Sequence, residues 1–211
     1  MPLRALVRFL FVFFLTYCAC AAQSISVGAI GGGRVTDDVL SQTGKLTEFT
    51  QSRFYDVGAQ VEIGLTNKFA VEFDALYHRL GFFSSFGAIT EYSTVHERDN
   101  SWEFPVLLKY KLRFGPLHPF VEAGVAPRTI GGRDVETSQS DYTTLGPPFI
   151  VISPVSYSPS VGFVAGGGLQ FNLGRLHLAP QLRYTRWATA QVDGSNQNQV
   201  DLLVGISWKV R

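Results

Sequence analysis

The sequence predicts an all-β fold: an eight-stranded antiparallel up-and-down transmembrane β-barrel. Three observations predict it. A short apolar segment with the features of an export signal opens the chain, apolar and polar residues alternate along most of the remaining chain, and short and long connections take turns between the alternating segments. Alternation with period two is typical of strands that have one apolar and one polar face. The alternation of connection lengths is typical of membrane barrels.

The first element, residues 1–22, is expected to be a cleaved signal peptide. Arginines near its start supply positive charge, residues 9–17 (FLFVFFLTY) form its apolar core, and small residues end it at Ala22. The apolar core is shorter than the roughly 20 residues that a transmembrane helix needs. We therefore expect residues 23–211 to form the mature barrel domain.

Composition argues against several other classes of protein. The 211 residues are enough for one domain, and 18 Lys and Arg nearly balance 17 Asp and Glu, so we expect no basic face for nucleic acid. Aromatic residues make up 13%, and 21 glycines stand against 1 methionine, which favours strands and turns over helices. Both cysteines, Cys18 and Cys20, lie in the signal peptide, so the mature domain has no disulfide and no cysteine-based metal site.

Three strands are expected in the first part of the mature domain. Residues 25–33 open it with weak alternation. In residues 54–65 (FYDVGAQVEIGL) apolar side chains at the odd positions alternate with carboxylates, glycines and a glutamine. Residues 69–78 repeat the pattern, with carboxylates between apolar neighbours.

Five further strands are expected. Residues 102–112, 176–184 and 200–210 alternate regularly, and no residue on their apolar faces is charged. Residues 119–126 and 161–171 alternate less clearly, and the second of these segments is rich in glycine. Together with the first three segments they make the eight strands of the expected barrel.

The connections between these segments alternate strictly in length. Antiparallel up-and-down strands bring all the short turns to one end of a barrel and all the long loops to the other. The uncharged stretch 142–174 is broken by prolines and glycines, so it is predicted to be loop followed by strand and not a membrane helix. The short connections are 66–68, 113–118 and 172–175, and the long ones are 34–53, 79–101, 127–160 and 188–198.

The polar face is expected to line the lumen, and the apolar face to meet lipid. Glycines on the polar face leave room for long side chains, which an eight-stranded barrel is just wide enough to hold. Charges of both signs lie on this face, and charges buried in a narrow lumen must be paired. Simple hairpin registers place Glu62 opposite Glu72, and Lys109 opposite Glu122. The expected structural charge network comprises Glu62, Glu72, Asp74, Glu103, Lys109, Lys111, Glu122, Arg183, Asp201 and Lys209.

Three segments resemble strands of the bacterial outer-membrane β-barrel domain family, whose best-known members are the small OmpA/OmpX-type barrels. Residues 102–110 (WEFPVLLKY) resemble the family's central strand, residues 119–124 (PFVEAG) resemble the next strand, and residues 182–187 (LRYTRW) resemble the end of the penultimate one. The resemblance covers residues 23–211. It implies a place in the outer membrane, short periplasmic turns and long external loops. It also implies outer-membrane lipid and the outer-membrane assembly machinery as partners.

We expect no catalytic residues, no cofactor and no metal. No histidine has a serine two residues away, as the lipid hydrolases among outer-membrane barrels have, and no metal-ligand spacing occurs. The glycine runs at residues 31–33 and 166–168 are not followed by Gly-Lys-Ser/Thr, which a phosphate-binding loop needs. His78 and His177 are interpreted as inward-facing structural hydrogen-bonding residues. Carboxylates in a lumen filled by side chains would not reach a substrate.

The long external loops are expected to carry the function, because loops on a rigid scaffold are where binding usually takes place. We expect a non-enzymatic protein that serves envelope integrity or surface interaction. Two alternatives stay open: a small or gated porin-like channel, and a secreted soluble lipocalin-like binding barrel. The candidate loop contacts for a surface ligand are the aromatic residues Phe82, Phe83, Phe86, Tyr92, Tyr142, Phe149 and Tyr157.

Overall fold

The computed structural model describes residues 24–36, 46–50, 52–87, 91–112, 117–140, 149–156, 158–189 and 196–210. Within these residues eleven strands form one antiparallel sheet, and no helix is long and apolar enough to cross a membrane. The predicted signal peptide lies outside the described residues. The strands are β1 (Ser24–Arg34), β2 (Leu46–Thr50), β3 (Tyr55–Gly64), β4 (Phe69–Gly87), β5 (Glu91–Glu103), β6 (Val106–Lys111), β7 (Leu117–Ser140), β8 (Phe149–Ser156), β9 (Ser160–Leu173), β10 (Leu176–Trp187) and β11 (Asn198–Lys209).

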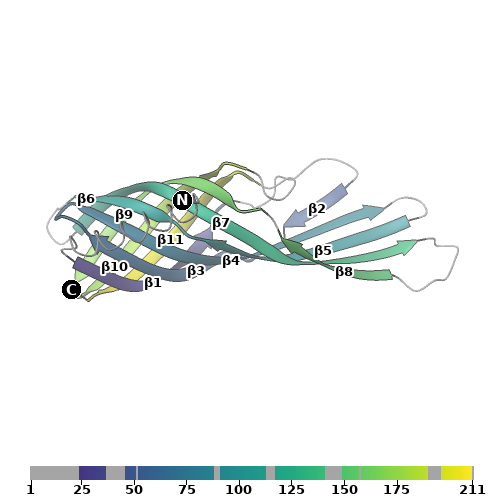
Figure 1. Ribbon diagram of the computed structural model, residues 1–211, viewed down its shortest axis with the longest axis horizontal. Helices are drawn as coiled ribbons and strands as arrows, with labels where there is room; N and C mark the ends of the chain where they lie inside the picture. Colours follow the sequence, from purple (N-terminus) through teal and green to yellow (C-terminus); the bar gives the residue numbers. More distant parts are fainter. Residues whose placement is uncertain are drawn as a thin grey trace, which may run out of the picture.

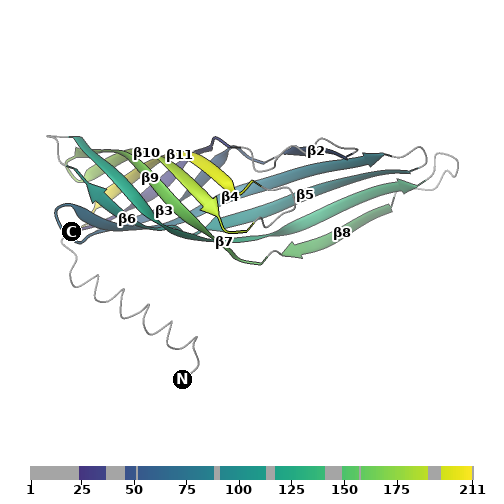
Figure 2. The same cartoon turned by 90° about the horizontal axis from the view of Figure 1, so that it is seen from above.

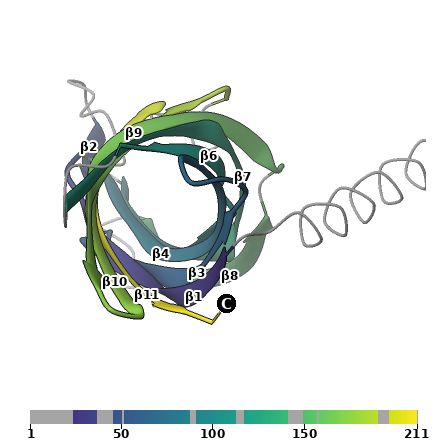
Figure 3. The ribbon, with the colours of Figure 1, turned by 90° about the vertical axis from the view of Figure 1, so that its left-hand side faces the viewer.

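The sheet closes on itself into a barrel. Each strand pairs with the next around the ring, and β11 returns to pair with β1, with Ser26 opposite Lys209 and Arg34 opposite Asp201. Seen along its axis, the barrel is a ring of ribbons around a central lumen (Figure 3). Closure leaves no strand edge within the barrel, and a barrel that crosses a membrane must have none because lipid offers no hydrogen bonds to a free edge.

β5 and β6 together make one strand of the barrel. Both lie between β4 and β7, and they are separated by Phe104 and Pro105. The register continues across the break, since Val106 lies opposite Phe73 and Glu103 lies opposite Leu76. A proline has no N–H to give to the sheet, which accounts for the interruption. The predicted barrel of eight antiparallel strands is therefore confirmed.

Three of the predicted long loops, 34–53, 79–101 and 127–160, are wrong in their extent, because strands occupy parts of them. β4 runs to Gly87 and pairs with β5 from Leu76 to Gly87, while β7 runs to Ser140 and pairs there with β5 and β8. β2 pairs with β4 from Leu46 to Thr50, inside the first predicted loop. These parts form an extracellular sheet of β2, β4, β5, β7 and β8 that projects beyond the barrel (Figures 1 and 2). The strands persist because they satisfy their backbone hydrogen bonds by pairing with one another.

The two faces of the barrel have opposite character. Apolar side chains at alternate positions face outward and are exposed, among them Leu108, Val121 and Leu202. The inward positions carry buried polar and charged side chains, among them Glu72 and Arg183. This arrangement fits a barrel surrounded by lipid. It gives no support to the lipocalin-like alternative, which needs an apolar interior for its ligand.

Candidate functional site

The barrel interior holds a cluster of ion pairs around Arg183 of β10. Its guanidinium is buried and donates three hydrogen bonds: Nε to Oε1 of Glu122 at 2.7 Å, and its two terminal nitrogens to Asp74 Oδ2 and Glu72 Oε1 at 2.6 Å each. The carboxylates come from β7 and β4, on different walls of the barrel. A guanidinium presents its donors as a rigid fork, so this one side chain ties three strands together across the lumen.

Lys109 of β6 completes this cluster. Glu62 and Glu72 lie directly opposite each other on β3 and β4, as the hairpin register predicted. The Lys109 ammonium forms an ion pair with Glu72 and lies 3.8 Å from Glu62 Oε2 and 3.6 Å from Glu122 Oε2. It thereby offsets a like-charge pair that would be unfavourable on neighbouring strands. Lys111 adds a second ion pair to Glu62, with 2.5 Å between Nζ and Oε1.

An inward-facing glycine makes room for this cluster. A Cβ atom at Gly166 of β9 would lie 3.1 Å from Oε1 of Glu122, 3.2 Å from Cγ of Arg183 and 2.7 Å from the Leu182 carbonyl oxygen. A larger residue would therefore displace the backbone of β10 or the ion pair between Arg183 and Glu122.

A second cluster lies nearer the extracellular end, around Arg34 at the end of β1. Its guanidinium lies 3.0 Å from Glu103 Oε1, 3.4 Å from Asp201 Oδ1 and 3.5 Å from Asp56 Oδ1. His78 Nδ1 lies 2.9 Å from the same oxygen of Asp56. These side chains come from β1, β3, β4, β5 and β11, so the cluster joins neighbouring strands around one side of the ring.

Polar side chains connect this second cluster to the wall beside it. Gln199 donates hydrogen bonds to Asp201 at 2.8 Å and to Glu103 at 3.3 Å, and its own oxygen accepts one from Trp187 Nε1 at 2.8 Å. The Arg128 guanidinium lies 3.8 Å from the centre of the Trp187 ring, a cation–π contact in a buried position.

The ten residues of the predicted charge network thus fall into three groups. Those around Arg183 and Lys109 lie together, and Glu103 and Asp201 lie in the second cluster. Lys209 is exposed at the periplasmic mouth and joins neither cluster. Sequence reasoning missed Arg34 because it was assigned to a loop. Extending the period-two pattern of β1 by one residue would have placed it inward beside Gly32.

More acidic than basic side chains are buried in the lumen. Among the described residues the buried carboxylates outnumber the buried lysines and arginines. The buried carboxylates are Asp56, Glu62, Glu72, Asp74, Asp99, Glu103, Glu122 and Asp201, and the buried cations are Arg34, Lys109, Arg128 and Arg183. These side chains form two groups of ion pairs and hydrogen bonds inside the barrel.

The candidate loop contacts are only partly described. Phe82, Phe83 and Phe86 lie on β4, Tyr92 on β5 and Phe149 on β8, where the backbone alone is described. Tyr142 and Tyr157 lie outside the described residues. Their role as surface contacts stays a prediction. In the described part of the chain, no group of three or more His, Asp or Glu side chains is arranged to hold a metal ion.

Comparisons with known proteins agree with this geometry. The family model described as "Outer membrane protein beta-barrel domain" matches residues 21–186. The comparison with curated protein sequences found no match. Among solved structures, Neisserial surface protein A is similar with a TM-score of 0.55 at 10% identity, over 87% of this chain and 96% of that one. The outer membrane protein OprG of Pseudomonas aeruginosa is similar with a TM-score of 0.53 at 14% identity, over 89% of this chain and 95% of that one. At these identities the likeness establishes the fold.

Proposed function

Because the chain belongs to the outer membrane protein β-barrel domain family, and so lies in the outer membrane, we propose that it is a non-enzymatic surface-binding protein. Its extracellular sheet, built from β2, β4, β5, β7 and β8, takes up an extended polypeptide segment from outside the cell. Outer-membrane lipid surrounds the barrel, and the assembly machinery remains a predicted partner during biogenesis.

The observation that carries this proposal is the free outer edge of β8. Within the described part of the chain β8 pairs with β7 alone, from Gly131 opposite Ser156 to Ser138 opposite Phe149. Its other edge presents backbone N–H and C=O groups, which are a template for strand addition. Recognition by strand addition draws its affinity from such backbone hydrogen bonds.

The sequence of β8 supports this choice over the opposite edge. Residues 149–153 read FIVIS, which are apolar or β-branched residues and a serine, without charge, whereas β2 carries Glu48. Charges on an edge strand discourage pairing with another chain. Pro154 offers no N–H, so residues 149–153 are the longest uninterrupted run on the edge of β8.

The filled lumen supports a binding role over transport. Buried side chains around Arg183 cross the interior and those around Arg34 line one side of it, whereas porins with open aqueous channels have 16 or more strands. A role in envelope integrity remains the second candidate, because a rigid barrel with paired strands also strengthens a membrane without binding anything.

The test uses a double substitution on the proposed edge and a matched double substitution on the opposite edge. Ile150→Lys with Ile152→Lys puts two positive charges on one face of β8, and Thr47→Lys with Phe49→Lys puts the same charges on one face of β2. The probe is a labelled peptide with the sequence of residues 133–138 (RDVETS), which β8 already pairs through its inner edge. Binding is measured by fluorescence anisotropy on the whole protein in zwitterionic detergent.

We expect the β8 variant to bind the peptide at least about tenfold more weakly, roughly 1.4 kcal/mol, and the β2 variant to bind it like the original protein. Equal binding by both variants would contradict strand addition at β8. In cells that lack the protein, the β8 variant should restore resistance to detergent only if envelope integrity is a separate role. A protein that binds no peptide yet fully restores resistance would favour the envelope-integrity candidate.

A further inference from the structure

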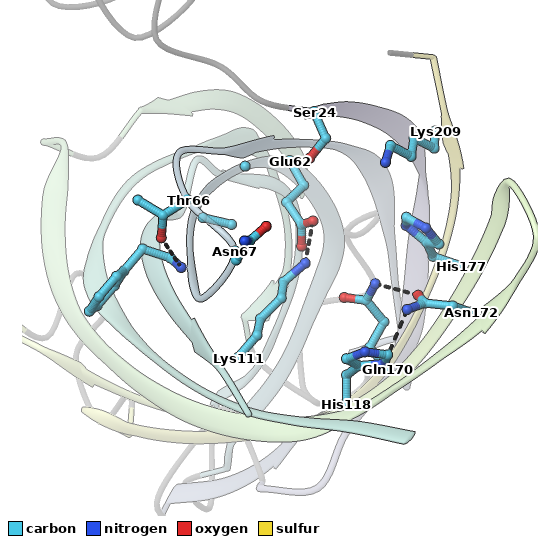
Figure 4. Close-up of a pocket in the computed structure, with 13 residues that line it drawn as sticks. Ser24, Glu62, Thr66, Asn67, Lys111, His118, Gln170, Asn172, His177 and Lys209 are labelled. Carbon is cyan, nitrogen blue, oxygen red and sulfur yellow. Dashed lines mark hydrogen bonds and ion pairs between the residues drawn. The ribbon is translucent and has the colours of Figure 1, made fainter. Parts of the chain in front are cut away.

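A polar cavity lies at the periplasmic mouth of the barrel. Its volume is about 240 Å³, and its lining comes from the ends of the strands and from the turn between β3 and β4. Figure 4 shows the side chains that converge on it, with Lys111 and Glu62 in the middle, Lys209 and His177 on the right, and His118 below, beside Gln170. The cavity shares Glu62 and Lys111 with the first lumen cluster, and its other polar side chains belong to neither cluster.

We propose that this cavity is a binding site for a small oxyanion, a carboxylate or phosphate group carried by a molecule of the periplasm. The charge balance of the lining favours an anion. Its carboxylate, Glu62, is already paired with Lys111 at 2.5 Å. Lys209 forms no ion pair with any described residue, and it leaves the mouth with a positive charge that an anion would offset.

The hydrogen bonds among the lining residues determine which nitrogen of His118 can donate a hydrogen bond to a ligand. Gln170 Nε2 donates to Asn172 Oδ1 at 2.7 Å, which turns the amide nitrogen of Asn172 toward His118 Nδ1 at 3.0 Å. An amide nitrogen can only donate, so Nδ1 of His118 accepts and the ring proton lies on Nε2. His118 is therefore held as a donor through its second nitrogen.

His177 lines the cavity, and one of its two ring nitrogens lacks a hydrogen-bond partner among the described residues. Its Nδ1 atom is buried and has no hydrogen-bond partner among the described residues, although buried polar atoms are usually satisfied. The residue lines the cavity from the start of β10, beside Lys209 of the neighbouring strand β11. Because Nδ1 is closed to solvent, an oxyanion in the cavity would contact the other ring nitrogen of His177, Nε2. Lys209, His118 and His177 together provide the donors that carboxylate and phosphate groups need.

The test measures binding of two probes, inorganic phosphate and succinate, to the whole protein in zwitterionic detergent. Isothermal titration calorimetry at about 150 mM sodium chloride screens charges that merely attract anions from a distance. The variants are Lys209→Gln and His177→Asn at the cavity. Lys68→Gln is the matched control, because Lys68 is exposed in a turn at the same end of the barrel and does not line the cavity.

We expect saturable binding of at least one probe, weakened at least about fivefold, or roughly 1 kcal/mol, by Lys209→Gln and by His177→Asn and unchanged by Lys68→Gln. Binding of phosphate alone assigns the site to phosphate groups, and binding of succinate alone assigns it to carboxylates. Absence of saturable binding, or an equal loss in Lys68→Gln, would overturn the proposal. A band that still shifts on boiling verifies that each variant keeps its folded barrel, so a lost site is distinguished from a lost fold.

Discussion

Arg183 is the residue on which the interior of the barrel depends most. Its guanidinium forms ion pairs with Glu72, Asp74 and Glu122 at once, and each of these carboxylates is itself buried. Removing one partner of a buried ion pair leaves an uncompensated charge, which costs far more than the pair contributes when it is intact. The stability of the barrel should therefore fall more when a cation of the lumen is removed than when one carboxylate is removed.

Arg183→Leu should lower the free energy of unfolding by roughly 3–5 kcal/mol, because it strands three buried carboxylates around one missing cation. Arg186→Leu is the control on the same strand, since Arg186 is exposed and bonds Asn198 at 2.6 Å. We expect it to cost less than about 0.5 kcal/mol. Urea unfolding in lipid vesicles measures both. Equal stability of the two variants would mean that water reaches the carboxylates and that the lumen is not closed.

Successive residues of each barrel strand face two environments in turn, the lipid outside and the lumen inside. On β11 the outward side chains include Val204, at 40% exposure, and Val210, at 67% just past the end of the strand. Asp201 and Leu203 alternate with the outward positions and are buried. A substitution on the outward face should therefore be judged by its depth in the membrane.

Val204→Arg should cost about 2–4 kcal/mol, because it places a charge on the lipid-facing side away from either end of the strand. Val210→Arg makes the same chemical change at the membrane interface, where the cost falls to about 0–1 kcal/mol. Unfolding of the two variants in vesicles gives the comparison. A similar cost at both depths would contradict the assignment of this face to lipid.

The alternation of apolar and polar residues predicted the strands of the barrel. It did not predict the strands of the extracellular sheet. Lipid on one side and charge on the other impose period two on residues such as those of β3. The outer part of β4 pairs with β2 and β5 beyond the barrel, where no lipid imposes that pattern. Pairing of near neighbours was predictable too, as with Glu62 and Glu72. The contact between Arg34 and Asp201 was not, because it joins residues 167 positions apart that meet only when the barrel closes.

The whole molecule divides into a closed barrel and an open sheet. Two clusters of buried charge lie in the lumen, and the extracellular sheet ends in the edges of β2 and β8. The barrel thus holds the chain in the membrane, while its two ends face different compartments with different chemistry.

Purified protein in planar bilayers should give no regular conductance steps, because ions cannot pass the layers around Arg183 and Arg34 without breaking several ion pairs at once. A porin with 16 strands, tested in the same bilayers, shows that a water-filled lumen would be detected. Uniform steps from this protein at ordinary voltages would support the gated-channel alternative and argue against a permanently filled lumen.

The continuity of β7 has a mechanical consequence. Its 24 residues run without a break from the periplasmic mouth to the extracellular sheet, flanked by β6, β9, β5 and β8. At about 3.3 Å per residue such a strand is roughly 80 Å long. Hydrogen bonds in an antiparallel sheet lie perpendicular to the strands, so a pull on the tip loads them in shear, all together, and does not peel them apart in turn. Tension applied outside the cell is thereby transmitted to the embedded ring, which behaves as an anchor under load.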